Sequence, residues 1–519
     1  MRSLGLPCGG LAVLVALLFT LTGSTPIAAE GGSRKERDAF GPFFDGPSRQ
    51  HLRPGAKRRS GGEATSWLRR WNSIAIDAAG LDHTPVAPGE DRDFAEQYGP
   101  GRSSRAMAIV HIAMFDAVIA VEGGYESYTG LPRQRGATSL KAAVARAAHD
   151  TLTALYPSQA ARFAAALAED LRQIRRGPAK TAGIALGRRA AAAILALRAA
   201  DGSQHAEPLV DVEWPTSDEP GRWRQDPISL IPLALGAHWA GVTPFALAAS
   251  DQFRAPAPPL LSSPDYAEAF GEVQRLGGDG VTTPTERNSE QTFIGTFWAY
   301  DGTPSLCAPP RLYNQVALAV ASSQRRLDVV QLARLLALVN VAMADAGIAA
   351  WDSKFFYDFW RPITGIREAD PGTGPTGAGD GNPDTLGDPS FTPLGAPASN
   401  LAGTPDFTPP FPAYPSGHAT FGGALFQTLR NFYGRDDVAF TFVSDEWNGT
   451  TVDGDGNVRP LVPRHFASLS EAEEENGQSR IYLGIHWSFD KVEGIAMGRQ
   501  VADHVFESVY RPERRKRGR

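Results

Sequence analysis

Residues 415–432 read PSGHATFGGALFQTLRNF and join a short polar motif to a helical pattern. Ser416 stands where the N-cap of that helix would stand. The first backbone N–H groups of the helix, including that of Gly417, lack partners within the helix and favour an anion. His418 is placed to exchange a proton with a bound group. The stretch therefore predicts a helix that begins at an oxyanion site, although a plain serine cap beside an incidental histidine has the same pattern.

A second stretch, residues 354–362, reads KFFYDFWRP and carries two cations. Lys354 and Arg361 are seven residues apart, which on one continuous helix places both on the same face. We expect Pro362 to end that helix. Two cations buried among aromatic residues are costly unless an anion pairs with them. Two surface cations lying over the aromatic rings are the alternative interpretation.

A third stretch, residues 479–490, reads SRIYLGIHWSFD. The guanidinium of Arg480 is a forked donor that suits an oxyanion. His486 and Asp490 are four residues apart on an expected helix. Asp490 can therefore orient the imidazole ring, or it can only support that turn.

The rest of the chain predicts a mainly α protein. Helical periodicity occurs in residues 67–79, 105–122, 140–155, 159–174, 180–200, 265–276, 286–300, 314–323 and 328–350. We expect two helical bundles with long connecting loops, over residues 66–235 and 236–510, with the oxyanion site in the second. A flexible lead-in (30–65) and a basic tail (511–519) would flank them. Residues 370–413 predict a lid or wall of the site, and residues 444–468 a second loop.

Several other candidate residues favour structural roles. His111 and Asp116 lie in an apolar helix and are expected to be hydrogen-bonded core residues, because five positions along a helix turn side chains to different faces. Cys307 is expected to be an unreactive thiol. Residues 453–457 begin like a calcium loop, but the required glycine and glutamate are replaced by Val458 and Arg464, which favours an ordinary acidic turn.

Composition and the N-terminus bear on the compartment. The chain has 519 residues and a net charge of −6, without the basic excess of a nucleic-acid-binding protein. Residues 1–29 predict a signal peptide, with an uncleaved N-terminal anchor as the alternative. We expect a secreted or periplasmic protein that is not in the membrane after cleavage, because no later segment has 18 consecutive apolar residues. Cys8 would leave with the signal, so no intrachain disulfide is expected.

The three stretches together form K-x6-RP, PSGH and SR-x5-H-x3-D, in that order. This pattern resembles that of the type 2 phosphatidic acid phosphatase superfamily, which contains acid phosphatases and vanadium-dependent haloperoxidases, and it implies their helical fold. The resemblance implies that His486 is the vanadium ligand, or the nucleophile toward phosphorus, and that His418 is the acid/base group. Lys354 would also polarise peroxide. It further implies one vanadate per chain and no haem, with the oxyanion held by Lys354, Arg361, Ser416, Gly417, Arg480 and His486.

The flanking residues favour one branch of that superfamily. Residues 346–362 (AGIAAWDSKFFYDFWRP) and 411–421 (FPAYPSGHATF) are similar to fungal vanadium chloroperoxidases, in which Trp351 and Phe411 would line the pocket. Asp301 would be a partner of Arg480, and Asp490 would support His486. The resemblance implies a haloperoxidase that oxidises bromide and iodide, with chloride as a further halide, to hypohalous acid.

Two other function classes use the same residues. A secreted acid phosphatase would bind phosphate in place of vanadate and use His486 as its nucleophile. A non-catalytic oxyanion-binding protein is disfavoured, because binding alone requires neither His418 nor His486. Under the haloperoxidase interpretation the partners are hydrogen peroxide and halide, and the sequence is compatible with an oligomer.

Overall fold

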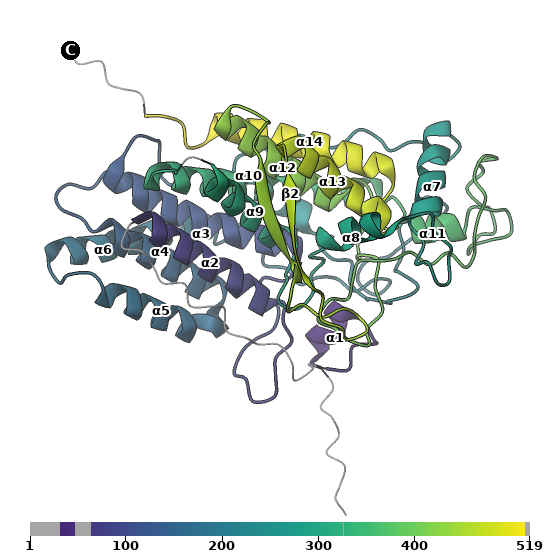
Figure 1. The fold of residues 1–519 in the computed structure, drawn as a ribbon, viewed down its shortest axis with the longest axis horizontal. Helices are drawn as coiled ribbons and strands as arrows, with labels where there is room; N and C mark the ends of the chain where they lie inside the picture. Colours follow the sequence, from purple (N-terminus) through teal and green to yellow (C-terminus); the bar gives the residue numbers. More distant parts are fainter. Residues whose placement is uncertain (1–31, 47–63, 325, 514–519) are drawn as a thin grey trace, which may run out of the picture. The chain divides into compact units, whose positions relative to one another are not determined.

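Helices dominate the computed structural model, which describes residues 32–46, 64–324 and 326–513 (Figure 1). The mainly α class is confirmed. The first half contains α1 (Arg34–Phe40), α2 (Ala64–Asp82), α3 (Gly99–Glu122), α4 (Leu140–Leu155), η1 (Pro157–Gln159), α5 (Ala160–Arg172), α6 (Pro178–Leu197) and η2 (Trp239–Gly241). The second contains α7 (Pro264–Leu276), α8 (Ser289–Phe297), α9 (Pro309–Ser323), α10 (Val329–Tyr357), α11 (Pro362–Arg367), α12 (Gly417–Tyr433), β1 (Phe440–Asn448), β2 (Leu461–Phe466), α13 (Leu469–Tyr482) and α14 (Ser488–Ser508).

Helix α10 lies at the centre of the core. It packs against α3, α12 and α14. Within the described residues, α3 and α10 are long and apolar enough to cross a membrane by length and composition, but nearly all of their apolar windows are buried inside the protein. Because α3 and α10 share this core, the described residues from Gly32 onward form one compact unit. The predicted division into bundles at residue 235 stays a prediction.

The expected helix over residues 354–362 is wrong. Helix α10 ends at Tyr357, and Asp358 follows in the left-handed conformation with φ 52°. Arg361 is extended, with φ −81° and ψ 156°, because a residue that precedes proline is sterically excluded from the helical region. Pro362 therefore begins α11 instead of ending α10, which is the position that proline favours. Lys354 and Arg361 consequently reach the site from two separate elements.

Part of the predicted loop over residues 444–468 is an antiparallel hairpin. Strand β1 pairs with β2, with Phe440 opposite Phe466, and the register is irregular between Val443 and Asn448. Asp453, in the turn of the hairpin, accepts hydrogen bonds from two backbone N–H groups of its own turn. Among the described residues, no group of three or more His, Cys, Asp or Glu side chains could hold a metal ion. The structure thus shows an acidic turn in which Asp453 is hydrogen-bonded to its own backbone, and the absence of calcium stays a prediction.

A flexible lead-in is wrong for residues 32–46. Ser33 and Glu36 form a capping box at the start of α1, and Phe40 and Phe44 pack in a small core with Phe94. These apolar contacts fix the segment against the body of the protein. The signal-peptide prediction (1–29) and most of the basic tail lie outside the described residues.

The predicted core residues are structural, as expected. Asp116 accepts hydrogen bonds from the backbone N–H groups of Tyr128 and Thr129. Burial raises the pKa of the Cys307 thiol to about 12 and lowers the pKa of His83, whose Nε2 lies 3.7 Å from its sulfur, to about 4. A protonated thiol beside a neutral imidazole is unreactive.

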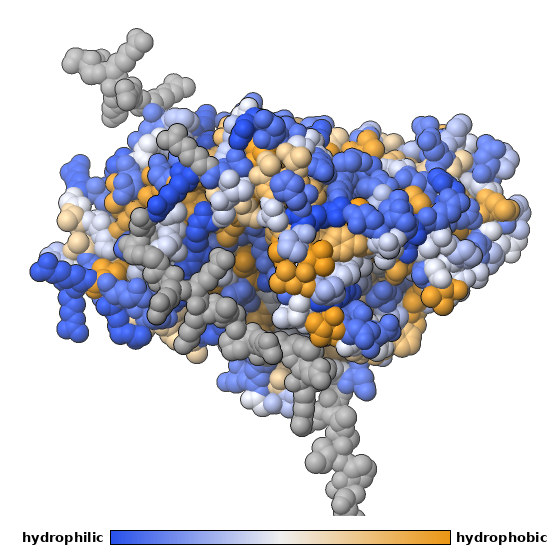
Figure 2. Space-filling view, in the orientation of Figure 1, coloured by the Kyte–Doolittle hydropathy of each residue, from blue (hydrophilic) through white to orange (hydrophobic). Residues whose placement is uncertain are grey.

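The visible face of the molecule is mostly polar, with hydrophobic residues in small separate patches (Figure 2).

Candidate active site

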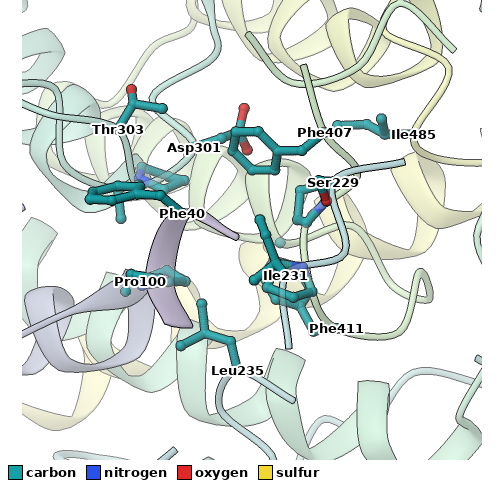
Figure 3. A pocket seen from close by; sticks show the side chains of 18 of the residues that line it. Phe40, Pro100, Ser229, Ile231, Leu235, Asp301, Thr303, Phe407, Phe411 and Ile485 are labelled. Atoms are coloured by element: carbon teal, nitrogen blue, oxygen red, sulfur yellow. The ribbon is translucent and has the colours of Figure 1, made fainter. Parts of the chain in front are cut away.

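A cavity opens beside the N-terminus of α12. Figure 3 shows Phe40 from α1 together with Ile231, Leu235, Phe411 and other side chains around it. Part of its wall comes from residues 401–411, so the prediction that the long loop forms a wall of the site is confirmed. Six of the predicted site residues line the cavity, namely Asp301, Trp351, Phe411, Gly417, His418 and His486. The other five are buried, namely Lys354, Arg361, Ser416, Arg480 and Asp490.

Lys354 and Arg361 meet at the ring of Phe411. The Nζ atom of Lys354 donates to the carbonyls of Pro412 and Ala413, at 2.8 and 3.0 Å, and lies 5.0 Å from the Phe411 ring centroid. The guanidinium carbon of Arg361 is also 5.0 Å from that centroid. Trp351 packs on Phe411 with ring centroids 4.9 Å apart. One aromatic pair therefore forms a cavity wall beside both cations.

Ser416 caps α12 as the sequence predicted. Its Oγ accepts a hydrogen bond from the N–H of Ala419, and the helix begins at Gly417. A Cβ added at Gly417 would lie 3.9 Å from Cε of Lys354 and 3.4 Å from the Trp351 ring. It would thus enter the space between the helix N-terminus and the cation, where an anion is favoured.

One ring nitrogen of His418 makes a hydrogen bond to the backbone. Its Nε2 lies within hydrogen-bond distance of the carbonyl of Ala299, so Nε2 must carry the hydrogen. The Nδ1 atom then has a free lone pair and lies 3.8 Å from Oδ1 of Asp301. Burial and the nearby Arg480 lower the pKa of His418 well below its ordinary value. The ring is thus a neutral base whose open nitrogen is Nδ1.

Arg480 and Asp301 form the expected pair. Nη1 of Arg480 donates to Oδ2 of Asp301 at 3.0 Å, and both residues are buried. Burial raises the pKa of Asp301, and Arg480 opposes that rise. The pair fixes the guanidinium at the site.

His486 precedes α14 and does not lie on it, which corrects the expected helical pairing with Asp490. A turn that includes Gly484 and Ile485 separates α13 from α14. Asp490 lies in the first turn of α14. The predicted contact still forms, because Nδ1 of His486 lies 2.7 Å from Oδ2 of Asp490. That carboxylate also accepts from the N–H of Trp487 at 3.0 Å.

The geometry fixes the tautomer of His486. Nδ1 donates to Asp490, so Nε2 carries the lone pair and accepts from Nη1 of Arg361 at 3.0 Å. Burial and Arg361 lower the pKa of His486 well below its ordinary value. A neutral imidazole whose lone pair is on Nε2 is the form that coordinates metals, and a metal bound there would replace the contact with Arg361.

The site has an excess of positive charge. Lys354, Arg361 and Arg480 are all fully buried cations, and Asp301 and Asp490 are the carboxylates beside them. Burial and Arg361 lower the pKa of Lys354 well below its ordinary value, and burial lowers the pKa of Arg361 to about 9. A buried cation is costly without a counter-ion, so the cluster is arranged to receive an anion.

Sequence comparison identifies the family. The chain is 32% identical to the vanadium chloroperoxidase of Curvularia inaequalis over 509 residues, which cover 82% of this chain and 79% of that protein. The chain belongs to the vanadium haloperoxidase family. Within that family it falls on the chloroperoxidase-like branch, and residues 334–514 match the model described as the VCPO second helical-bundle domain.

Solved structures show the haloperoxidase fold. A bacterial vanadium-dependent iodoperoxidase matches with a TM-score of 0.66 at 22% identity, over 86% of this chain and 98% of that one. The holo-type bacterial vanadium-dependent chloroperoxidase matches with a TM-score of 0.57 at 18% identity, over 82% of this chain and 95% of that one. These likenesses show a shared fold, and the sequence relationship makes the chain an enzyme of the haloperoxidase family.

The residues present fit the vanadate of this family. Nη2 of Arg361 is buried and has no hydrogen-bond partner, although a buried donor is normally satisfied. It belongs to the guanidinium whose Nη1 contacts Nε2 of His486. An oxyanion held at His486 would satisfy this donor and balance the charge of the cluster.

Some residues of the site were missed by sequence reasoning. Phe40 lines the cavity from a segment expected to be flexible, and the carbonyl of Ala299 fixes the tautomer of His418. Tyr313 and Asn476 donate to the carbonyl of His418 at 2.9 and 3.1 Å. The capping box at Ser33 could have revealed α1, whereas the backbone contacts have no signature in the sequence.

Proposed function

We propose that this haloperoxidase oxidises bromide and iodide, and also chloride, to hypohalous acid at one vanadate per chain. The observation that carries the proposal is the unpaired Nη2 of Arg361 beside the lone pair of His486, within a cluster of buried cations. Vanadate bound there would supply Lewis-acid activation of hydrogen peroxide. Its oxygens would be held by Lys354, Arg361, Ser416, Gly417 and Arg480, and its metal by His486.

His418 serves as the acid/base group in this proposal. Its Nε2–H is committed to the carbonyl of Ala299, so the proton of incoming peroxide would be taken at Nδ1. Asp301, whose Oδ1 is 3.8 Å from Nδ1, would then stabilise the positive charge of the ring. Lys354 would polarise the oxygen that the halide attacks, because its Nζ keeps one hydrogen beyond its two carbonyl partners.

Chloride is included because of the cavity wall. Trp351 and Phe411 form an apolar surface beside the cations, and removing water from a halide makes it a stronger nucleophile. The similarity to the Curvularia inaequalis vanadium chloroperoxidase supports the same halide.

The decisive experiment compares halide oxidation with ester hydrolysis. Metal-free protein is assayed for oxidation of bromide, iodide and chloride by hydrogen peroxide, with and without vanadate, beside hydrolysis of a phosphate ester. We expect oxidation only with vanadate. Efficient hydrolysis without vanadate-dependent oxidation would establish the acid phosphatase alternative, with His486 as nucleophile.

We also propose that the protein is secreted or periplasmic. The proposal rests on the apolar run of residues 11–21 after Arg2. N-terminal sequencing of protein recovered outside the cytoplasm tests it, with cleavage after Ala29 as the expected result. A retained Met1 would establish the uncleaved anchor instead.

A further inference from the structure

Residues 299–301 contact both the acid/base histidine and an oxyanion-binding arginine, the first through a backbone carbonyl and the second through a side chain. The carbonyl of Ala299 accepts from Nε2 of His418, and the carboxylate of Asp301 accepts from Arg480. Tyr300, between them, has φ 54°, in the left-handed region that a bulky residue occupies only when its surroundings impose it. The orientation of both contacts therefore depends on what holds Tyr300.

Strand β1 holds this segment through consecutive residues. Oγ of Ser444 donates to the carbonyl of Phe297 at 2.7 Å, and the N–H of Asp445 donates to the hydroxyl of Tyr300 at 2.6 Å. The N–H of Tyr300 in turn donates to Oε1 of Glu446 at 3.3 Å. Of these three contacts, the one with Glu446 involves the backbone N–H of Tyr300, the residue with positive φ.

Glu446 is itself fixed in a buried network. It is fully buried, and its Oε2 accepts from Oγ of Ser399 and from Nη1 of Arg459, each at 2.6 Å. Arg459 also donates to Oγ of Ser399 at 2.8 Å. A buried ion pair often adds no more stability than apolar residues of the same size, so stability alone does not account for it. The network instead gives the carboxylate of Glu446 one orientation.

We propose that Glu446 is a positioning residue for His418: held by Arg459 and Ser399, it fixes Tyr300 so that Ala299 keeps His418 in its Nε2–H tautomer and Asp301 stays on Arg480. This role rests on the proposed function of His418 as the acid/base group. Without Glu446, the Tyr300 peptide relaxes toward negative φ and turns the Ala299 carbonyl away from the ring. His418 then also adopts the Nδ1–H tautomer, which has no lone pair at Nδ1 to take a proton.

The tautomer of His418 is a direct readout. The full-length protein is labelled with 15N-histidine, and two-bond 1H–15N spectra are recorded with and without vanadate. A His418→Gln spectrum identifies the signals. We expect the Nε2–H tautomer in the wild type and a mixture of tautomers in Glu446→Gln. We expect turnover in Glu446→Gln to fall about tenfold. This is the lower end of the loss seen when a residue that orients a metal ligand through a hydrogen bond is removed. KM for hydrogen peroxide changes less than about twofold, because Glu446 does not touch the substrate.

Asp201→Asn is the matched control. Asp201 is also a buried carboxylate that accepts from an arginine and a serine, at 2.6 Å from Arg105 and 2.7 Å from Ser203, but it does not contact residues 299–301. We expect it to lower the melting temperature and leave the His418 signals unchanged. If Glu446→Gln lowers the melting temperature but keeps wild-type His418 signals and turnover, Glu446 is only structural and the proposal is overturned.

If Glu446→Gln does not fold, Ser399→Ala tests whether Glu446 positions His418. It removes one hydrogen bond to Oε2 of Glu446 and keeps the ion pair with Arg459. We expect the same mixture of His418 tautomers to a smaller extent, and wild-type signals would overturn the proposal. The spectra require no turnover, so they judge the positioning role even if the protein fails to oxidise halide, which would defeat the proposed function alone.

Discussion

Two pairs of buried histidines occupy different environments in this protein. In the described residues, His83 and His111 lie in the helical core, where each ring nitrogen contacts a backbone atom or an amide side chain. His418 and His486 lie at the cavity, among the cations Lys354, Arg361 and Arg480. The first pair is hydrogen-bonded within the helical core, and the second pair lines the cavity.

A lowered pKa alone does not distinguish a functional histidine from a structural one. Burial lowers the pKa of His83 and His111 to about 4, and burial also lowers the pKa of His418 and His486. What distinguishes the cavity pair is that both rings line the cavity and that Arg361, Lys354 and Arg480 all lower their pKa. Substitutions of the two pairs should therefore separate binding and turnover from stability.

The largest effect is expected from His486→Ala. It removes the nitrogen that would bind vanadium and leaves Nη1 of Arg361 with one partner fewer. We expect vanadate affinity to fall by more than about 100-fold, since even the loss of a partner behind a metal ligand costs up to that factor. Equilibrium dialysis against vanadate measures the change. Retained tight binding would overturn the assignment of His486 as the ligand.

His418→Ala should separate turnover from binding. The ring contacts Ala299 and faces Asp301, and it is not an oxyanion donor in this site. We expect turnover to fall by about 10²- to 10⁴-fold, the usual contribution of a general acid/base, with vanadate affinity within about threefold of the wild type. Steady-state bromide oxidation at saturating vanadate measures turnover. Unchanged turnover would remove the acid/base role.

Arg361→Lys tests the unpaired donor with a smaller change. Lysine keeps the charge and loses the planar fork, so Nη2 has no replacement. We expect about tenfold weaker vanadate binding, which corresponds to one charge-assisted hydrogen bond. Arg105→Lys is the control, because Arg105 pairs with Asp201 away from the cavity. Equal affinity in wild type and Arg361→Lys would mean that Nη2 does not contact the oxyanion.

The fold was largely predictable, because the helices have strong apolar periodicity and clear caps. The prediction failed at two places, one governed by a local rule and one by a non-local pairing. Arg361 is extended rather than helical, and the rule for residues before proline already indicated this. The hairpin β1–β2 was missed because its pairing joins residues separated by a polar turn, and it is stabilised in part by stacking of Phe440 on Phe466.

The residues of the site were predictable in type but not in detail. The three motifs named the cations and both histidines, because spacing and residue chemistry are visible in a sequence. They did not reveal which ring nitrogen of each histidine carries the lone pair. That depends on the Ala299 carbonyl for His418 and on the Asp490 carboxylate for His486. Such choices arise from tertiary contacts, which a single sequence does not record.

The smallest effect on activity is expected from His111→Gln, which changes the core pair. We expect vanadate affinity and turnover within about twofold of the wild type, because no contact of His111 reaches the cavity, and a loss of stability of about 1–3 kcal/mol from the polar contacts left unmade. Urea unfolding followed by circular dichroism measures the stability. Lost turnover at wild-type stability would instead place His111 in the function of the site.

The pH dependence of unfolding sharpens this contrast further. Burial lowers the pKa of His111 from 6.5 in the unfolded chain to about 4 in the folded protein, so the unfolded state binds more protons between these values. The stability that the neutral ring contributes is fully present above pH 6.5 and is lost as the pH falls toward 4. Because glutamine does not titrate, His111→Gln should lose less stability than the wild type over that interval. An identical loss in both proteins would show that other groups, His83 among them, account for the acid sensitivity of the core.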